Sequence, residues 1–342
     1  MKKTVFVVDD NVTNLTMAAN ALKSHYTVRT IPSGEKTIAL LEKIRPDIFL
    51  LDIEMPDMDG FDVLKYLKGD ERFHELPVIF LTAKTDFDTE IEALEMGVSD
   101  FIGKPFNPAV LLNRVRHHID INELIRERTF QLHKARQDII FVLADMVETR
   151  DDSTGDHLGR TSQLVKLLLE HMLEKKVYHN QISGWDFDLI AECSLMHDVG
   201  KISTPDSILK KPGRLTPEEW VIMKQHTTEG EKIFNKIAAR SGENVFLRNA
   251  KIFAISHHER WDGSGYPHGL RGGDIPLQGR LMAISDVYDA LMSRRVYKDA
   301  FSSGKALEIM LGERGTHFDP LIIDVFHEIY SHVNEVLYNG VT

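Results

Sequence analysis

Five short apolar runs recur at regular spacing through the first third of the chain, and stretches with helical periodicity separate them. The runs are TVFVVDD, YTVRTIP, DIFLLDI, PVIFLTA and DFIGKPF, and helical patterns such as EKTIALLEKIR lie between them. Near-continuous aliphatic and β-branched runs are typical of strands buried on both faces, as in a parallel sheet covered by helices. The pattern predicts an α/β domain over residues 1–120, with a (βα)5 doubly wound parallel sheet.

A long region without glycine or proline follows this α/β segment. From residue 111 to about residue 150 the apolar positions mostly step by three, four or seven, and charged residues fill much of the rest. This spacing predicts one long helix or two in succession, with a seam that can pack as a coiled coil. We assign residues 121–147 as a helical linker that joins two chains in a homodimer. The alternative is a helix that packs only on its own domain, because polar residues interrupt the seam. These residues are Asn122, Thr129 and Arg136.

Beyond this linker the pattern is helical throughout, and glycine and proline mark the turns. The strand pattern disappears, so we expect an all-α domain over residues 148–342. A chain of 342 residues is long enough for two domains of ordinary size. The sequence therefore predicts an α/β domain followed by a helical one.

The composition excludes several classes of partner. With 41 Lys and Arg against 52 Asp and Glu, the formal net charge is −11, and no basic tract stands out. Binding to DNA or to a membrane surface needs a basic face, so we expect neither partner. The apolar run Val5–Val8 is too short for a signal peptide or a membrane span, and we expect a cytoplasmic protein. The single cysteine, Cys193, excludes an internal disulfide and is expected to be a buried structural thiol.

Polar and charged residues stand at the ends of the predicted strands. Asp9 and Asp10 follow the first strand, Asp52 ends the third, Thr82 the fourth, and Lys104 follows the fifth. In open parallel sheets the functional site forms at these carboxyl ends. Three carboxylates at one edge repel one another unless a hard cation lies between them, and oxygen ligands favour Mg²⁺. An ionised aspartate beside Mg²⁺ and a lysine is a competent nucleophile for phosphorus.

These motifs resemble those of receiver domains of two-component response regulators. The resemblance covers residues 1–120 and rests on VVDDN, LLDIEMPDMDG, LTAK and DFIGKPF. It implies that a cognate histidine kinase phosphorylates Asp52, with Mg²⁺ held by this residue and the two carboxylates after the first strand. The residues that it assigns to support this reaction are Asp9, Asp10, Thr82, Lys104 and, at the aromatic switch position, Phe101.

Histidines and aspartates recur at separated points of the helical domain, in ETRDDSTGDHLGR, LMHDVGKI, MKQHTTEG, SHHERWDGSGYP and ISDVYDAL. Adjacent residues on a helix point about 100° apart, so two neighbours reach one metal only at a helix end or where several metals share the space. Two adjacent pairs therefore indicate more than one metal ion. Imidazole with carboxylate suits Fe, Mn, Co, Ni or Zn better than Mg²⁺. The residues concerned are His157, His197, Asp198, His226, His257, His258 and Asp286.

Any one of these histidines, taken alone, is more often a surface or core residue than a ligand. We leave the remaining candidates in that ordinary class because no break in an apolar helix stands beside them. They are His117, His118, His171, His179 and His268.

The set resembles the HD superfamily of metal-dependent phosphohydrolases, and more narrowly its HD-GYP family. The resemblance covers roughly residues 135–340, with HDVGKI as the HD pair and HHERWDGSGYP as the GYP motif. It implies a two-metal centre in which Asp198 bridges the ions. One ion would be held by His157, His197, Asp198 and Asp286, and the other by Asp198, His226, His257 and His258.

HD-GYP proteins hydrolyse cyclic di-GMP to pGpG and often on to GMP. Water between two metal ions loses its proton near neutral pH, which fits attack on a phosphodiester. The resemblance gives His197, Asp198 and Lys201 catalytic roles, with Lys201 facing the scissile phosphate. The residues that it places against the substrate are Lys201, Tyr266, Arg295 and Lys298.

Two other functions stay open on the sequence alone. One is a phosphohydrolase for another cyclic dinucleotide. The other is an output module without catalysis that binds a nucleotide or a partner protein, and the GYP loop is the expected protein contact. The full set of seven ligands argues against the second of these. We expect phosphorylation of Asp52 to activate the output domain.

The number of metals depends on one departure from the family pattern. Some HD-GYP members hold a third ion through a glutamate four residues before the TGxH histidine, but this chain has Ser153 there. A neutral hydroxyl is a weak ligand, and two carboxylates balance two ions better than three. We therefore predict two metals, with the third site weak or empty, and expect Ser153→Glu to raise the stoichiometry. Residues that could substitute for the missing glutamate are Glu148, Asp151, Asp152 and Asp156.

Overall fold

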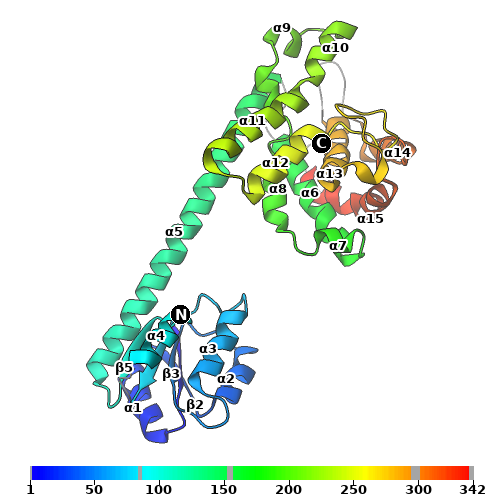
Figure 1. Ribbon diagram of the computed structural model, residues 1–342. Helices are drawn as coiled ribbons and strands as arrows, with labels where there is room; N and C mark the ends of the chain where they lie inside the picture. The colour runs from blue at the N-terminus through cyan, green and yellow to red at the C-terminus, as the bar shows by residue number, and fades with distance from the viewer. Residues whose placement is uncertain (1, 84–86, 152–156, 294–300, 339–342) are drawn as a thin grey trace. The chain divides into compact units, whose positions relative to one another are not determined.

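The structure is a computed structural model, and it describes residues 2–83, 87–151, 157–293 and 301–338. The chain divides into two compact units, residues 1–133 and 134–342 (Figure 1). The division falls inside one long helix, α5, which spans Pro108–Glu148. Ser153, Arg295 and Lys298, which the sequence analysis singled out, lie outside the described residues.

The N-terminal unit is a five-stranded parallel sheet with the strand order β2-β1-β3-β4-β5. Its strands are β1 (Thr4–Val8), β2 (Thr27–Ile31), β3 (Ile48–Asp52), β4 (Val78–Thr82) and β5 (Asp100–Gly103). The helices between them are α1 (Val12–Leu22), α2 (Gly34–Leu41), α3 (Gly60–Gly69) and α4 (Phe87–Glu95). The predicted doubly wound sheet is therefore confirmed.

Alternation along the strands divides the core of this unit into two layers. Phe6 and Val8 of β1 belong to one buried cluster, whereas Val5 and Val7 belong to the cluster on the opposite face. Because successive side chains of a strand point to opposite faces, an uninterrupted apolar run fills both layers. This packing puts the ends of β1, β3 and β4 at one edge of the sheet, where the polar residues follow.

Helix α5 is a single helix of 41 residues, so the sequence region without glycine or proline forms one helix and not two. Near its start, Val115 and Ile119 are buried in one of the core layers of the N-terminal unit. Near its end, Ile140 and Ala144 are buried in the core of the C-terminal unit. Both ends therefore pack on their own units, and the residues 123–139 between them are exposed.

The C-terminal unit is helical, as predicted, in the part of the chain that the structure describes. Its longer helices are α6 (His157–Glu174), α8 (Phe187–Ser194), α10 (Pro217–Lys224), α11 (His226–Ser241), α12 (Val245–Ser256), α13 (Leu277–Met292), α14 (Ser303–Gly312) and α15 (Pro320–Leu337). The shorter helical segments are η1 (Thr149–Asp151), α7 (His179–Ile182), η2 (Val199–Ser203), α9 (Asp206–Leu209) and η3 (Gly272–Asp274). They enclose one apolar core, which includes fully buried side chains of α6, α12, α13 and α15.

Cys193 lies in this core, and burial raises the pKa of its thiol to about 12, as expected for a structural cysteine. Among the described residues, no helix combines the length and the apolar character that crossing a membrane requires.

Candidate functional site

The sheet edge of the N-terminal unit brings together the carboxylates predicted from the sequence. Carboxylate oxygens of Asp9, Asp10 and Asp52 lie within 4.8 Å of one another. The ammonium of Lys104 lies 2.7 Å from Asp9 Oδ2 and 2.6 Å from Asp52 Oδ2. Burial raises the pKa of Asp52, and the hydrogen bond from Lys104 opposes this rise. The arrangement is an oxygen-rich pocket with one cation already beside the candidate phosphoacceptor.

The neighbouring strands supply the other two predicted residues of this edge. Thr82 is buried at the end of β4. Phe101 lies on β5, is half-buried, and packs edge-on against Phe80 with 6.1 Å between ring centroids. Gly60, at the start of α3, has no room for a side chain, because a Cβ there would overlap the backbone of Asp52. The loop after β3 can therefore lie tightly against the phosphoacceptor.

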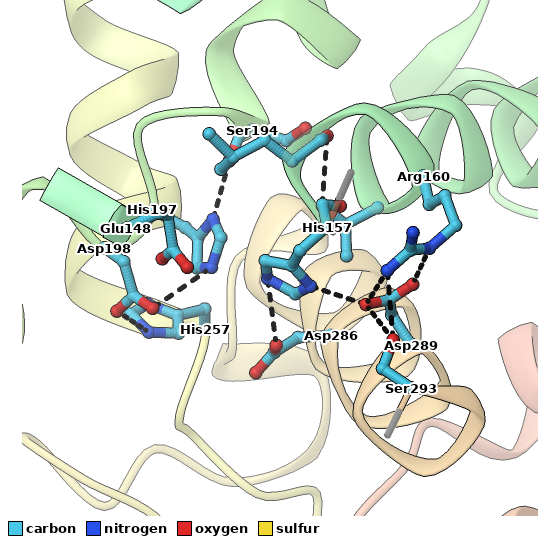
Figure 2. A network of polar contacts seen from close by, with 12 residues as sticks. Glu148, His157, Arg160, Ser194, His197, Asp198, His257, Asp286, Asp289 and Ser293 are labelled. Carbon is cyan, nitrogen blue, oxygen red and sulfur yellow. Dashed lines mark hydrogen bonds and ion pairs between the residues drawn. The ribbon is translucent and has the colours of Figure 1, made fainter. Parts of the chain in front are cut away.

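In the C-terminal unit, helix ends carry nearly all of the predicted metal ligands. His157 begins α6 and His226 begins α11. The pair His197–Asp198 follows α8, and the pair at residues 257–258 follows α12. Asp286 lies within α13. Adjacent residues can thus turn toward one centre, because each pair stands where its helix ends. Figure 2 shows His197 and Asp198 of the first pair together with His157 and His257.

Hydrogen bonds through Nδ1 orient the rings of this centre. When Nδ1–H donates, the neutral ring keeps a lone pair on Nε2, which is the form that binds metals. Four rings share this arrangement. Nδ1 of His157 lies 2.7 Å from the Asp289 carboxylate. The other three rings bond backbone carbonyls: His197 that of Ser194 at 2.9 Å, His226 that of Met223 at 2.7 Å, and His257 that of Phe253 at 3.0 Å.

One group of donors surrounds Asp198 Oδ1. Ligand atoms of Asp198, His226, His257 and His258 all lie within 4.8 Å of one another. Oδ1 is 3.3 Å from Nε2 of His226 and 3.5 Å from Nε2 of His257. These two Nε2 atoms face each other at 3.3 Å. Two lone pairs at that distance repel unless a cation lies between them, so the donor set fits a metal ion.

A second group lies on the other side of Asp198. Ligand atoms of Glu148, His157 and His197 are within 4.8 Å of one another. Oδ2 of Asp198 is 3.4 Å from Nε2 of His197, and Oδ1 of Asp286 is 3.7 Å from Nε2 of His157. The two oxygens of Asp198 therefore face different groups, which is the geometry that a bridging carboxylate needs.

The protonation of these side chains suits cation binding. Burial lowers the pKa of His226 to about 4 and holds the pKa of His258 well below its usual value. Although burial also lowers the pKa of His197, the neighbouring Asp198 raises it to about 9, so a metal must displace a proton there. Nε2 of His197 and Oδ1 of Asp198 are buried and make no hydrogen bond of good geometry among the described residues, although Nε2 of His197 lies 3.4 Å from Oδ2 of Asp198 and Oδ1 lies 3.3 Å from Nε2 of His226.

Segment η2 brings Lys201 to the same carboxylate. The Lys201 ammonium lies 2.7 Å from Oδ2 of Asp198. Burial raises the pKa of Asp198, but the charges of Lys201 and His197 hold it well below its usual range. Gly200 allows this placement, because a Cβ there would overlap the carbonyl of His226. The HDVGK stretch therefore packs directly on the first turn of α11.

The loop after the histidine pair folds back over the centre. The buried carboxylate of Glu259 accepts hydrogen bonds from the backbone N–H groups of His268 and Leu270, at 2.8 and 2.9 Å. The backbone N–H of Tyr266 donates to the carbonyl of His258 at 3.2 Å. The side-chain rings of His258 and Tyr266 lie 4.7 Å apart, measured between their centroids. Glu259 thus fixes the loop that holds the predicted substrate residue Tyr266 beside a predicted ligand.

Sequence reasoning missed the carboxylate that holds His157. Asp289 is buried and binds Arg160 as well as the imidazole, and the hydroxyl of Tyr338 donates to it at 2.8 Å. Burial raises the pKa of Asp289, yet hydrogen bonds from His157 and Arg160 lower it to about 2. A signal was present, because Asp289 follows Asp286 by three positions on a predicted helix and so lies on the same face.

Comparison with known proteins agrees with both halves of this description. Residues 5–116 match the response regulator receiver domain, and residues 142–322 match the HD domain. A relative from Vibrio cholerae named "Probable cyclic di-GMP phosphodiesterase" is 40% identical over 339 residues, which cover 94% of this chain and 77% of the relative. The chain belongs to the HD-domain response regulators.

Two further proteins resemble the chain along much of its length. The cyclic di-GMP phosphodiesterase response regulator RpfG of Xanthomonas campestris is 33% identical over 337 residues, covering 94% of this chain and 86% of RpfG. A Vibrio cholerae protein named "3'3'-cGAMP-specific phosphodiesterase 2" is 38% identical over 270 residues, covering 79% of this chain and 46% of that protein. Proteins named for different cyclic dinucleotide substrates are thus similar to this chain.

Proposed function

We propose that this HD-domain response regulator hydrolyses the phosphodiester bonds of cyclic di-GMP, to pGpG or GMP, under the control of Asp52 phosphorylation. The observation that carries the proposal is the position of Asp198, whose two oxygens face two separate groups of imidazoles. Phosphodiester hydrolysis by paired metal ions requires such a bridging ligand. The names of two relatives that each match 94% of this chain support the same substrate.

The donors favour divalent transition metals in the HD domain. Imidazole and carboxylate ligands suit Fe, Mn, Co, Ni or Zn, whereas the carboxylates of the receiver edge suit Mg²⁺. When bound, two transition metals supply Lewis-acid activation of water and neutralise charge on the phosphate. We propose one ion at His157, His197, Asp198 and Asp286, and the other at Asp198, His226, His257 and His258.

The chain's own residues position the substrate and its charge. Lys201 is held 2.7 Å from Asp198, so its ammonium stands beside the bridging position, where a phosphate oxygen would gain a charge-assisted hydrogen bond. Tyr266 presents its ring next to His258. Arg295 and Lys298 would bind the substrate's other phosphate. A local set of cations and metals of this kind compensates for the net negative charge of the whole chain.

A mixed cyclic dinucleotide is the second candidate substrate, because the relative named for 3'3'-cGAMP covers 79% of this chain. The two substrates differ in one base and share both phosphodiester bonds. The test is to incubate the Mn²⁺-loaded full chain with cyclic di-GMP and, separately, with 3'3'-cGAMP, and to follow products by chromatography. We expect the larger kcat/KM for cyclic di-GMP, and a preference for 3'3'-cGAMP would reassign the substrate.

We further propose that the chain is a homodimer through α5. Exposed apolar residues repeat every seven positions along this helix, and three of the four lie on the exposed stretch between its buried ends. They are Ile125, Leu132, Ile139 and Met146. A second exposed apolar series alternates with them, because Ile121 lies four positions before Ile125, Ala135 three after Leu132, and Val142 three after Ile139. Such a repeat is the seam of a two-stranded coiled coil, and a second copy of the same helix presents the matching seam.

Two further partners follow from the same assignment. A cognate histidine kinase would donate the phosphoryl group to Asp52, which the receiver match and the Lys104 contact support. Partner proteins can also reach the GYP loop, because Asp262 and Ser264 in it are exposed.

A further inference from the structure

We propose that Glu148, the last residue of α5, is an additional ligand to the ion held by His157 and His197. This inference rests on the proposed two-metal function. The carboxylate of Glu148 comes within 4.8 Å of the ligand nitrogens of both histidines, and only 4% of the residue is exposed. A carboxylate so deeply buried in a cluster of imidazoles is costly unless a positive charge compensates it.

The tautomers of the two histidines assign Glu148 to their ion and not to a separate one. Nδ1 of His157 donates to Asp289, and Nδ1 of His197 donates to the carbonyl of Ser194. Each ring, once it is neutral, therefore has one lone pair, on Nε2, and can bind one metal only. Since a carboxylate oxygen of Glu148 lies within 4.8 Å of a ring nitrogen of each histidine, we infer that all three residues bind the same ion.

Charge balance supports this position. The ligands assigned so far contain two carboxylates, Asp198 and Asp286, against two divalent ions. Glu148 would add a third negative charge on the side where His157 Nε2 lies 3.7 Å from Asp286. Three carboxylates leave one positive charge on the centre, which an approaching phosphodiester anion or hydroxide can neutralise.

A charge pair with Lys201 is the competing role for Glu148, but Lys201 lies closer to Asp198 than to Glu148. The ammonium of Lys201 is 3.9 Å from Oε1 of Glu148, beyond hydrogen-bond length, but 2.7 Å from Oδ2 of Asp198. Lys201 therefore pairs more closely with Asp198, and the Glu148 carboxylate lies near the imidazoles of His157 and His197.

The backbone that carries Glu148 is anchored to the active-site segment. Arg150, two residues later, donates to the carbonyls of Ile202 and Thr204 at 3.0 and 3.2 Å, and its guanidinium lies 2.7 Å from Asp206 Oδ1. The end of α5 is thereby tied to η2, which holds Lys201. Because α5 starts at Pro108 beside the receiver sheet, the same helix would connect the receiver with a metal ligand.

The test compares metal retention in Glu148→Gln with the wild-type full chain and with Glu192→Gln. Glu192 is a matched control, because it is also buried in this unit but pairs with Arg136, at 2.7 Å. Each protein is loaded with Mn²⁺, dialysed against graded chelator, and measured by elemental analysis. All variants carry the same receiver domain, so any Mn²⁺ bound there adds equally to the metal content of each protein.

We expect Glu148→Gln to lose one of two ions at a chelator concentration at least tenfold lower than wild type and Glu192→Gln. Glu148→Asp, which keeps the charge on a shorter side chain, should fall between them and provides the answer if the Gln variant misfolds. Retention equal to wild type in both Glu148 variants would overturn the proposal. The proposal would also be overturned if the wild type held three ions and Glu148→Gln held two, since Glu148 would then bind a separate ion. A wild type without tightly bound ions would instead refute the proposed function.

Discussion

Ordinary hydrogen bonds orient the imidazoles of the metal centre. Three of them donate to carbonyls three or four residues earlier in the chain, in the last turn of the preceding helix, so the helix end itself fixes the ring. His157 differs, because its Nδ1 is held by Asp289 from another helix, α13. A carboxylate behind a metal-binding imidazole fixes the tautomer and makes Nε2 a stronger donor.

Replacing Asp289 by asparagine tests this orienting role. The amide can still accept from His157 Nδ1, but the negative charge that stabilises the partly buried Arg160 and the imidazole is lost. We expect metal affinity at one site to fall roughly 10- to 100-fold, measured by competition with a chelator. Asp324→Asn, which breaks only an exposed pair with Arg314, is the control and should bind metal as wild type does.

The sequence singled out the histidines of the proposed metal centre because each stands at a break in an apolar helix, where a histidine has no ordinary reason to be. Asp289 and Glu148 were harder for physical reasons. Both lie within helical patterns, where an acidic residue is most often solvated. Glu148 is nine positions before His157, and only the path of the chain between them decides whether the two meet. Sequence periodicity does not determine that path.

At the scale of elements, α5 combines three environments in one helix. Its first turns belong to the receiver core, its last turns belong to the HD core, and the exposed part between them carries three of the four residues of the seven-residue repeat. The sequence pattern predicted the helix but could not separate its buried apolar residues from its exposed ones. Val115 and Ile119 share the apolar spacing of the seam, yet they are buried against the sheet. Burial separates the residues available to a second chain from those that are already packed.

Leu132→Glu tests the dimer seam. A charge at the centre of a coiled coil is costly to bury, so we expect the variant to be monomeric at concentrations where wild type is dimeric, as measured by light scattering. Phe130→Glu is a matched control, because Phe130 and Leu132 are 69% and 70% exposed but Phe130 lies off the seam. Dissociation in both variants, or in neither, would contradict the assigned seam.

At the scale of the whole molecule, two sites of different chemistry occupy two separate units. The receiver edge offers oxygen ligands and a lysine, whereas the HD centre offers mainly imidazoles. The sequence predicted this division because the strand pattern ends where the histidine motifs begin. The spacing of sequence motifs does not determine whether phosphorylation activates or inhibits the output.

Asp52→Asn separates the two sites experimentally. The amide is not a nucleophile for phosphorus, so we expect acetyl phosphate to label the wild type and not the variant. Metal content in the HD domain should be unchanged, and phosphorylation of the wild type should raise its turnover. Mass spectrometry that finds the phosphoryl group on another residue in the variant would show that Asp52 is not the acceptor.

The most direct test of the central claim is turnover of cyclic di-GMP by wild type and Asp198→Ala, both loaded with Mn²⁺ and followed by chromatography. Asp198 faces both ligand groups, so its loss should disturb both ions at once. We predict that the wild type forms pGpG or GMP, and that the variant forms neither while its circular dichroism stays native. Turnover at the wild-type rate in a folded Asp198→Ala variant, or none in the metal-loaded wild type, would contradict the account.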